Sequence, residues 1–483
     1  MRVEFSGGAY TARSIISGCQ RAVNVFPEPA NPDAPAKVVM YERPGLVVKA
    51  TPATSGAARC EYRATNGELF RVVGNKVIYV SSAFVQTVLG TITTTTGIAS
   101  MSDNGIGVVL VDGSTNGYYI TIPGHVMTNF SGAEPAFYGS DSVWYTDTFF
   151  VFNRPNTQQY YLSPPNWDGA TPFDALDVAA KVGGADNIAA IAVVKGDIWG
   201  IGTLTTQPFT NVGAADFPFL PVQGVLIDQG TVAKYSVAQT DLSVFWLSQD
   251  TSGHAILIEG KDYAASRVSN FAVENEWQRY ETISDAVGFV YQQGGHTFYQ
   301  ITFPTADKTW VYDMSFPDPM GAWHERTWTD GDGQEHRHRA QTCAFAYGVS
   351  LVGDWETGKL YQQDVDVRTD DGGPIVRRRS FPHLVSDGNR ISYNQFVADI
   401  SVGEGEGYVV DSPPMISLRW SDTRGASWGN PVMQSSGATG QYYTSPSWRR
   451  LGMARDRVFE LFWSEPVPCA LQGAWIDVTP AGT

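Results

Sequence analysis

The chain has 483 residues, of which 43% are hydrophobic and only 17% are charged, and it contains 49 glycines, 27 prolines and 12% aromatic residues. This length suffices for a large buried core, and the glycine, proline and aromatic content is typical of strands and turns. A formal net charge of −16 argues against a general nucleic-acid-binding protein, which needs a basic surface to displace counterions from phosphates.

Prolines set the character of residues 1–50. Five of the residues from Phe26 to Pro44 are prolines, a density that forbids a helix and favours extended backbone. We therefore predict that residues 1–50 form an extended strap lying on other surfaces of the protein. The candidate docking residues of this strap are Phe26, Pro27, Tyr41 and Pro44.

Strand-like hairpins recur through residues 51–365. In each, short β-branched and aromatic runs meet at a Gly, Asp or Asn turn. The hairpins lie at Glu68–Val80, Gly105–Ile122, Val143–Phe152, Asp197–Gly202, Val244–Ile258, His296–Phe303 and Val349–Gln362. Their spacing of roughly 40 to 50 residues is typical of propeller blades. We predict an all-β protein with a β-propeller-like body of about six blades, a number that the sequence does not determine. The best helical candidate, Phe173–Lys181, is weak.

Acidic residues and glycines at 364–373 interrupt the strand pattern, so we expect an additional β region over residues 366–483. Within it, a polar turn lies between two tryptophans and resembles the Asp-box, Ser-x-Asp-x-Gly-x-x-Trp, of sialidases and related propellers. The turn contains Trp420, Ser421, Asp422, Gly425 and Trp428, with its Asp one place early. The motif is a folding element in Asp-box proteins, so we expect a structural role here.

Two arginine clusters stand out on this acidic chain. They consist of Arg377, Arg378, Arg379, Arg449 and Arg450. Guanidinium groups pair readily with carboxylates in bidentate geometry, so we expect these arginines to contact a neighbouring subunit or another component of a larger assembly. A solvated surface and contact with DNA phosphates remain alternatives.

Other polar clusters do not predict chemistry. His336 and His338 could share one face of a strand, but a metal needs a further ligand and the interleaved arginines repel it. The acidic residues from Asp364 to Asp371 do not follow the order of an EF-hand. We therefore predict no catalytic residue, metal site or cofactor.

The four cysteines, Cys19, Cys60, Cys343 and Cys469, are scattered and form no CxxC pair. We expect four buried thiols and no disulfide framework. The first residues lack the apolar run of a signal peptide, and no apolar run approaches the roughly 20 residues that cross a bilayer. These features predict synthesis in a cytoplasm and no membrane segment.

Several segments, in their order and spacing, resemble the tail-hub proteins of short-tailed bacteriophages, a family also called packaged-DNA stabilisation proteins. The segments are Val23–Glu28, Arg43–Leu46, Ile198–Gly202, Phe271–Glu274, Gly295–Tyr299, Thr309–Asp313, Trp323–Glu325 and Trp448–Gly452. The resemblance implies a virion structural protein that forms a hexameric ring beneath the portal and adaptor. Such a ring would close the head, retain packaged DNA, conduct duplex DNA at ejection and carry the tail needle, fibres or tailspikes.

A second hypothesis comes from the Asp-box-like turn alone. It predicts a propeller that binds or cleaves glycans, and it differs from the hub hypothesis in needing no ring. A sialidase would also need a convergent arginine triad, an acid and a tyrosine nucleophile, and the sequence contains only one such turn.

Overall fold

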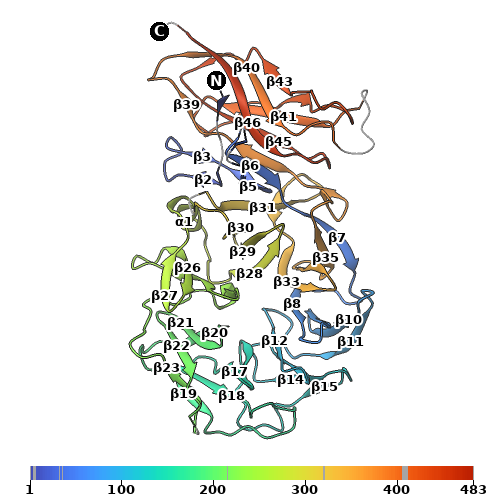
Figure 1. The fold of residues 1–483 in the computed structure, drawn as a ribbon, viewed down its shortest axis with the longest axis vertical. Helices are drawn as coiled ribbons and strands as arrows, with labels where there is room; N and C mark the ends of the chain where they lie inside the picture. Colours follow the sequence, from blue (N-terminus) through green and yellow to red (C-terminus); the bar gives the residue numbers. More distant parts are fainter. Residues whose placement is uncertain are drawn as a thin grey trace.

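The computed structural model describes residues 2–3, 7–31, 33–34, 36–214, 216–318, 321–404 and 412–481. Figure 1 shows a ring of β-sheets with a second β region on one side of it, and both chain termini lie in that second region. The all-β prediction is confirmed. The described part of the chain contains one α-helix, α1 (Phe271–Trp277), and one short 3-10 helix, η1 (Lys234–Ser236).

The α-helix is capped by Asn270, whose side chain accepts hydrogen bonds from the backbone amides of Ala272 and Val273. This helix was not predicted, and the weak candidate Phe173–Lys181 instead consists of turns followed by a short strand. No helix in the described ranges is long and apolar enough to cross a membrane.

Seven antiparallel units of four strands form the blades of a propeller, of which the first five are separate sheets and the last two are parts of larger sheets. The first blade contains β8 (Ala58–Arg63), β9 (Leu69–Val73), β10 (Lys76–Val80) and β11 (Gln86–Thr91), and the second contains β12 (Ser100–Asp103), β13 (Gly107–Val111), β14 (Gly117–Thr121) and β15 (Met127–Asn129). The third contains β16 (Val143–Thr146), β17 (Phe149–Asn153), β18 (Gln159–Leu162) and β19 (Val178–Ala180), the fourth β20 (Ile188–Val194), β21 (Asp197–Gly202), β22 (Thr206–Asn211) and β23 (Phe219–Pro221), and the fifth β24 (Ala238–Gln239), β25 (Val244–Gln249), β26 (Ala255–Lys261) and β27 (Ala264–Arg267). The sixth contains β28 (Val287–Gln293), β29 (His296–Phe303), β30 (Lys308–Asp313) and β31 (Trp323–Thr329), and the seventh contains β33 (Ala340–Ala346), β34 (Val349–Asp354), β35 (Leu360–Asp364) and β7 (Gly45–Ala50).

The first strands of the blades contact one another in turn and close the ring, from β8 through β33 and back to β8. Each of the seven segments predicted as hairpins lies in a different blade. Five of them are hairpins, whereas Asp197–Gly202 and His296–Phe303 are the single strands β21 and β29. The ring therefore has one blade more than the approximate number expected. The difference arises at β7, which the sequence placed in the strap and which completes the seventh sheet by pairing with β35, Val48 opposite Tyr361.

The second β region consists of two packed sheets, as in a β-sandwich. One sheet contains β43 (Ser447–Arg449), β40 (Ile391–Ile400), β46 (Leu471–Pro480), β6 (Val38–Glu42), β5 (Val25–Pro29), β1 (Arg2–Val3) and β44 (Met453–Ala454). The other contains β4 (Ala22–Val23), β38 (Arg377–Ser380), β45 (Asp456–Trp463), β41 (Met415–Ser421), β42 (Val432–Ser435) and β39 (Leu384–Val385). Smaller pairs are formed by β2 (Tyr10–Thr11) with β3 (Cys19–Gln20), by β36 (Thr369–Asp370) with β37 (Gly373–Pro374), and by β32 (Glu335–Arg337) with β31.

The propeller and the sandwich share backbone hydrogen bonds through β4. Val23 pairs in parallel with Glu325 of β31 and antiparallel with Arg378 of β38, so one sheet continues from the sixth blade into the sandwich. The largest apolar cluster also crosses this boundary, joining Trp323 of the sixth blade with Phe381 and Phe459 of the sandwich. Residues 1–50 thus supply strands to both regions.

Closure of the seventh blade depends on Leu46 of β7, which is 1% exposed and packs with Val352 and Tyr361. Truncation in Leu46→Ala should lower the free energy of unfolding by about 2–5 kcal/mol, because the surrounding blades cannot fill the cavity. Urea unfolding followed by tryptophan fluorescence measures this change. Val365→Ala, at an exposed position after β35, is the matched control, and equal midpoints for both variants would contradict a closing role for β7.

Candidate functional site

The arginine run in β38 lies at the seam between the propeller and the sandwich. Arg377 and Arg379 are both 0% exposed, so their prediction as contacts with another subunit is wrong. The Arg377 Nε lies 2.9 Å from Glu42 Oε1, and Arg379 Nη1 donates to the carbonyl of Gly8 at 3.0 Å. Burial lowers the pKa of Arg379 to about 9.

Arg378 lies in the same strand with its side chain 18% exposed. Its guanidinium contacts Glu335 of β32 at 2.6 Å and Glu460 of β45 at 3.7 Å. Arg21 pairs with Glu325 at 2.8 Å and Arg419 with Glu460, which extends the charge network across the seam. The arginine run therefore joins the two regions of one chain, with carboxylates whose positions the sequence alone could not reveal.

A second ion pair of the seam is completely buried. Arg43 and Asp370 have side chains 0% and 1% exposed, and Arg43 Nη1 donates to Asp370 Oδ1 at 2.9 Å. The same guanidinium donates to Asn24 Oδ1 at 2.8 Å and to the carbonyl of Thr327 at 3.0 Å. A buried charge needs this full set of partners. Asp370, one of the acidic residues compared above with an EF-hand, is thus paired with Arg43.

Of the candidate docking residues of the strap, Phe26 lies against the sixth blade. The Phe26 ring is 5.4 Å from the Phe298 ring, edge-on, and 5.3 Å from His296. Tyr41 is opposite Phe26 in the β5–β6 pair and its side chain is partly exposed. Pro27 and Pro44 are buried. All four residues remain candidates for a docking contact. The aromatic contacts of Phe26 given above are with another segment of the same chain.

The Asp-box-like turn follows β41 in the sandwich and lies outside the propeller. Ser421 Oγ accepts hydrogen bonds from the amides of Thr423 and Gly425, and Asp422 holds Arg457 at 2.6 Å. Gly425 has φ +92° close to Cys19, and Trp428 lies 5.0 Å from the Arg419 guanidinium. Each side chain supports the turn, and Trp420 packs on Phe459.

Arg449 and Arg450 differ from the first cluster because both are exposed, at the end of β43. They remain candidates for contact with a neighbouring molecule. The two histidines at 336 and 338 diverge. His336 lies between Asp307 and Asp330 at 2.8 and 3.2 Å, hydrogen bonds that raise its pKa, whereas His338 is buried. No group of three potential metal ligands occurs within the described ranges.

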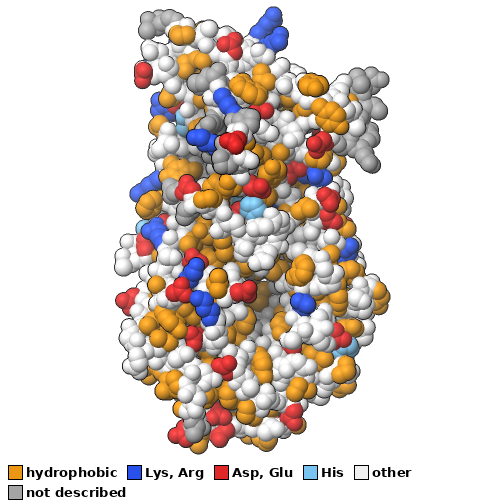
Figure 2. All heavy atoms as spheres, viewed as in Figure 1, with side chains coloured by type: hydrophobic (Ala, Val, Ile, Leu, Met, Phe, Trp, Pro, Cys, Tyr) orange, Lys and Arg blue, Asp and Glu red, His pale blue; other side chains and the backbone are white. Residues whose placement is uncertain are grey.

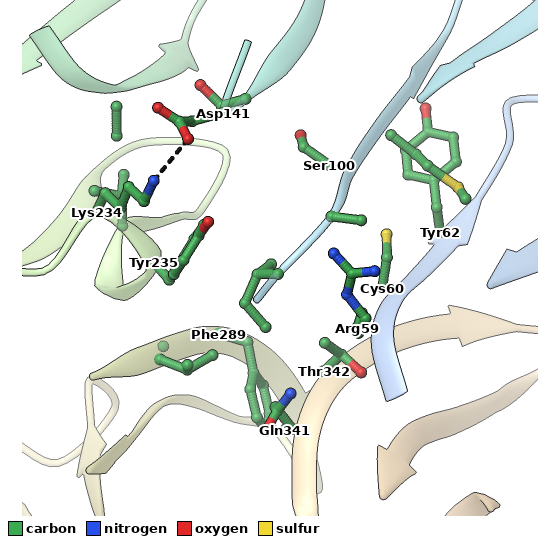
Figure 3. A pocket seen from close by; sticks show the side chains of 18 of the residues that line it. Arg59, Cys60, Tyr62, Ser100, Asp141, Lys234, Tyr235, Phe289, Gln341 and Thr342 are labelled. Atoms are coloured by element: carbon green, nitrogen blue, oxygen red, sulfur yellow. Dashed lines mark hydrogen bonds and ion pairs between the residues drawn. The ribbon is translucent and has the colours of Figure 1, made fainter. Parts of the chain in front are cut away.

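The first strands of the blades surround an axial cavity of about 260 Å³. Figure 3 shows Lys234 and Asp141, joined at 2.6 Å, on one side of the cavity, and Arg59, Cys60 and Tyr62 on another. Arg59 donates to the carbonyls of Gly74, Thr94 and Gly97, so its charge is satisfied by backbone. Figure 2 shows the hollow at the centre of the ring.

The thiols that line this cavity are poor nucleophiles. Burial raises the pKa of Cys343 to about 12 and raises that of Cys60 further above its ordinary value. A thiol reacts as the thiolate, which these pKa values disfavour at neutral pH. Cys19, Cys60 and Cys469 are buried and Cys343 is half-buried, each as a free thiol.

Removing Arg43 should destabilise the whole seam. The variant Arg43→Ala leaves the Asp370 carboxylate buried without its partner, so we expect a loss of about 3–5 kcal/mol in the free energy of unfolding. Arg449→Ala, at an exposed position, should change it by no more than about 0.5 kcal/mol. Urea unfolding monitored by circular dichroism measures the change in the free energy of unfolding for both variants. A loss below about 1 kcal/mol for Arg43→Ala would contradict the importance of this pair.

Two buried histidines should make the fold acid-sensitive. Burial, reinforced by nearby positive charge, holds the pKa of His324 and of His338 well below the ordinary 6.5. Below pH about 6.5 the unfolded chain therefore binds more protons than the folded chain, and each such histidine lowers stability by up to about 1.4 kcal/mol per pH unit. Stability should be level above this pH and fall as the pH drops from 6.5 to 5.

Urea unfolding between pH 8 and pH 5 measures this dependence. The variant His324→Gln cannot take up that proton in either state, so its stability should fall less steeply with acid than that of the wild type. His254→Gln, at a partly exposed position, is the matched control. An unchanged slope for His324→Gln would show that His324 titrates equally in both states.

Comparison with known families matches both regions of the fold. The model described as bacteriophage P22 Gp10, β-propeller, matches residues 3–368, and that described as bacteriophage P22 Gp10, β-sandwich, matches residues 377–479. No curated protein matches the chain. Among solved structures, the WD40 β-propeller domain of Doa1 is 12% identical, with a TM-score of 0.39, over 66% of this chain and 96% of that one. A TM-score this low carries no argument.

The two family matches cover the propeller and the sandwich in their order along the chain, and together they span nearly all of it. The resemblance seen in the sequence is therefore confirmed. The chain belongs to the bacteriophage P22 Gp10 family of tail-hub and stabilisation proteins, and it is a structural protein of a phage tail.

Proposed function

We propose that this chain is the tail hub, or nozzle, of a short-tailed phage. It assembles as a homo-hexameric ring beneath the portal and its adaptor, closes the filled head, retains the packaged DNA and forms the channel for ejection. It is synthesised in the host cytoplasm and acts in the virion, where the ring also carries the tail needle and the fibres or tailspikes. The observation that carries this proposal is the pair of family matches over both regions of the chain.

The size of the axial cavity bears on where DNA would pass. The first strands of the blades contact their neighbours, and the cavity that they enclose has a volume of only about 260 Å³. We therefore place the DNA channel between the subunits of the ring and not inside one propeller.

The charge of the chain suits transient passage of DNA. Each cationic contact with a phosphate adds to affinity and would slow a moving duplex. The chain has 33 basic against 49 acidic residues, and its longest arginine run is occupied by carboxylates and carbonyls at the seam. Such a protein can surround DNA and bind it weakly.

A glycan-binding or glycosidase function has less support. Its motif, the turn at 420–428, lies in the sandwich, where its side chains stabilise the turn itself. We infer that the protein works by assembly and not by catalysis.

Mass photometry of the purified protein, alone and with the adaptor and portal of the same phage, tests this proposal. We expect a six-fold ring on the portal, visible by negative-stain microscopy, because the hub role depends on a channel between subunits. A protein that stays monomeric with both partners, while the adaptor binds the portal normally, would overturn it. A chromogenic sialoside serves as the parallel assay, and its cleavage would favour the glycosidase.

A further inference from the structure

One face of the propeller is formed by two kinds of turn. Strands in an antiparallel blade reverse direction at each turn, so the turns after the first and third strands point to the same side. We call this side the turn face. In the first five blades it comprises residues 64–68 and 81–85, 104–106 and 122–126, 147–148 and 163–177, 195–196 with 212–214 and 216–218, and 240–243 and 262–263; the seventh blade adds 347–348. We include the adjoining strand ends, which are Arg63 of β8, Asn211 of β22, Lys261 of β26 and Phe345 of β33.

Polar contacts between neighbouring blades stabilise the turn face. Each contact joins the turn after the first strand of one blade to the turn after the third strand of the next blade, or to the strand end beside that turn. Glu68 pairs with His125 at 3.0 Å, and the Asn104 amide donates to the carbonyl of Trp167 at 2.7 Å. The contacts continue with Asp147 and Asn211 at 3.0 Å, and with Lys195 and Asp262 at 2.7 Å. Repetition of this contact makes the face a preorganised surface.

Large apolar side chains project from the turn face. Seven of them, from six different blades, are each more than half exposed. They are Val85, Ile106, Val126, Leu176, Val212, Leu242 and Phe345. Exposed apolar side chains gathered on one face indicate a surface that another molecule covers. Apolar side chains are also spread over the face of the propeller seen in Figure 2.

Two hollows adjoin one another on the turn face. The larger, of about 570 Å³, is lined by Tyr291, Phe345 and Asp241, and the smaller, of about 460 Å³, by Tyr79 and Tyr347. Arg63 lines both hollows. Pockets beside exposed aromatic rings are where interfaces concentrate their binding energy, because an inserted side chain loses its water there.

The charge of the turn face selects its partner. Six of its exposed residues are aspartates, namely Asp147, Asp168, Asp174, Asp216, Asp241 and Asp262. The exposed cations at this face are Lys195, which is paired with Asp262, and Arg63 and Lys261 at the adjoining strand ends. An acidic surface attracts a cationic partner and repels DNA phosphates. A second copy of this chain brings the same net charge of −16, and Arg377 and Arg379 of its longest arginine run are buried.

We propose that the turn face docks another protein of the tail, one that presents lysine or arginine side chains around apolar anchors. One long cationic side chain enters the 570 Å³ hollow, where its stem packs against Phe345 and its charge meets Asp241. The inference rests on the proposed function only in that the chain acts inside a tail assembly. It adds the surface used and the chemistry of the partner.

The test compares two multiple variants whose altered residues are all exposed, so that both should fold. The turn-face variant carries Leu242→Asp, Phe345→Asp, Asp216→Lys and Asp241→Lys. The control variant carries Leu204→Asp and Asp228→Lys, which lie on the opposite face. Each is mixed with every other purified tail protein of the same phage, and binding is measured by biolayer interferometry at low and at physiological salt. Ring formation on the portal is recorded in parallel by mass photometry.

We expect the turn-face variant to bind one cationic tail protein at least about tenfold more weakly, the scale of losing a single interface anchor. Wild-type binding to that protein should weaken as salt rises, and the control variant should behave as wild type. If the turn-face variant binds every tail protein normally, the inference is wrong. It is also wrong if that variant loses only self-association or only binding to a labelled DNA duplex.

The two proposals fail differently. A wild-type protein that forms no ring with portal and adaptor contradicts the proposed function, whatever the variants do. A wild-type ring together with an unaffected turn-face variant contradicts only the docking surface.

Discussion

Strand β4 is two residues long, yet the arrangement of the whole molecule depends on its pairing. Because Val23 bonds to the sixth blade on one side and to β38 of the sandwich on the other, the two regions share one sheet. The chain then continues through β5 and β6 of the sandwich and returns as β7 in the seventh blade. Residues near the N-terminus therefore close the propeller and join it to the sandwich, and neither region has an independent edge at this boundary.

Charges at this seam are buried, which is costly unless every one has a partner. Arg43 has Asp370, Asn24 and two backbone carbonyls, and Arg377 has Glu42. Such pairs add less stability than apolar packing of equal volume, but a wrong pairing leaves an uncompensated charge. The network is suited to holding one relative orientation of propeller and sandwich.

The seam, the axial cavity and the turn face differ in the contacts that they can make with other molecules. Arg377 and Arg379 are buried at the seam, so they are not available to a neighbouring subunit or to DNA. The axial cavity has a volume of about 260 Å³, and the DNA channel that we propose lies between subunits. The turn face carries exposed apolar side chains among aspartates, and polar contacts join its turns between blades. It is the surface that we propose for docking another tail protein.

The sequence by itself determined the strands, the turns and the approximate repeat, because alternation of side chains and Gly, Asp or Asn turns are local properties. Five of the seven predicted hairpins were located in this way, and so were the extended segments β5 and β6. Only the tertiary structure decided that β7 belongs to the last blade and that Arg377 and Arg379 are buried. The reason is distance along the chain: Arg377 meets Glu42, and Arg43 meets Asp370, across more than 300 residues. No local pattern predicts such a pairing, because the sequence of an arginine run is the same whether its side chains face solvent or a distant carboxylate.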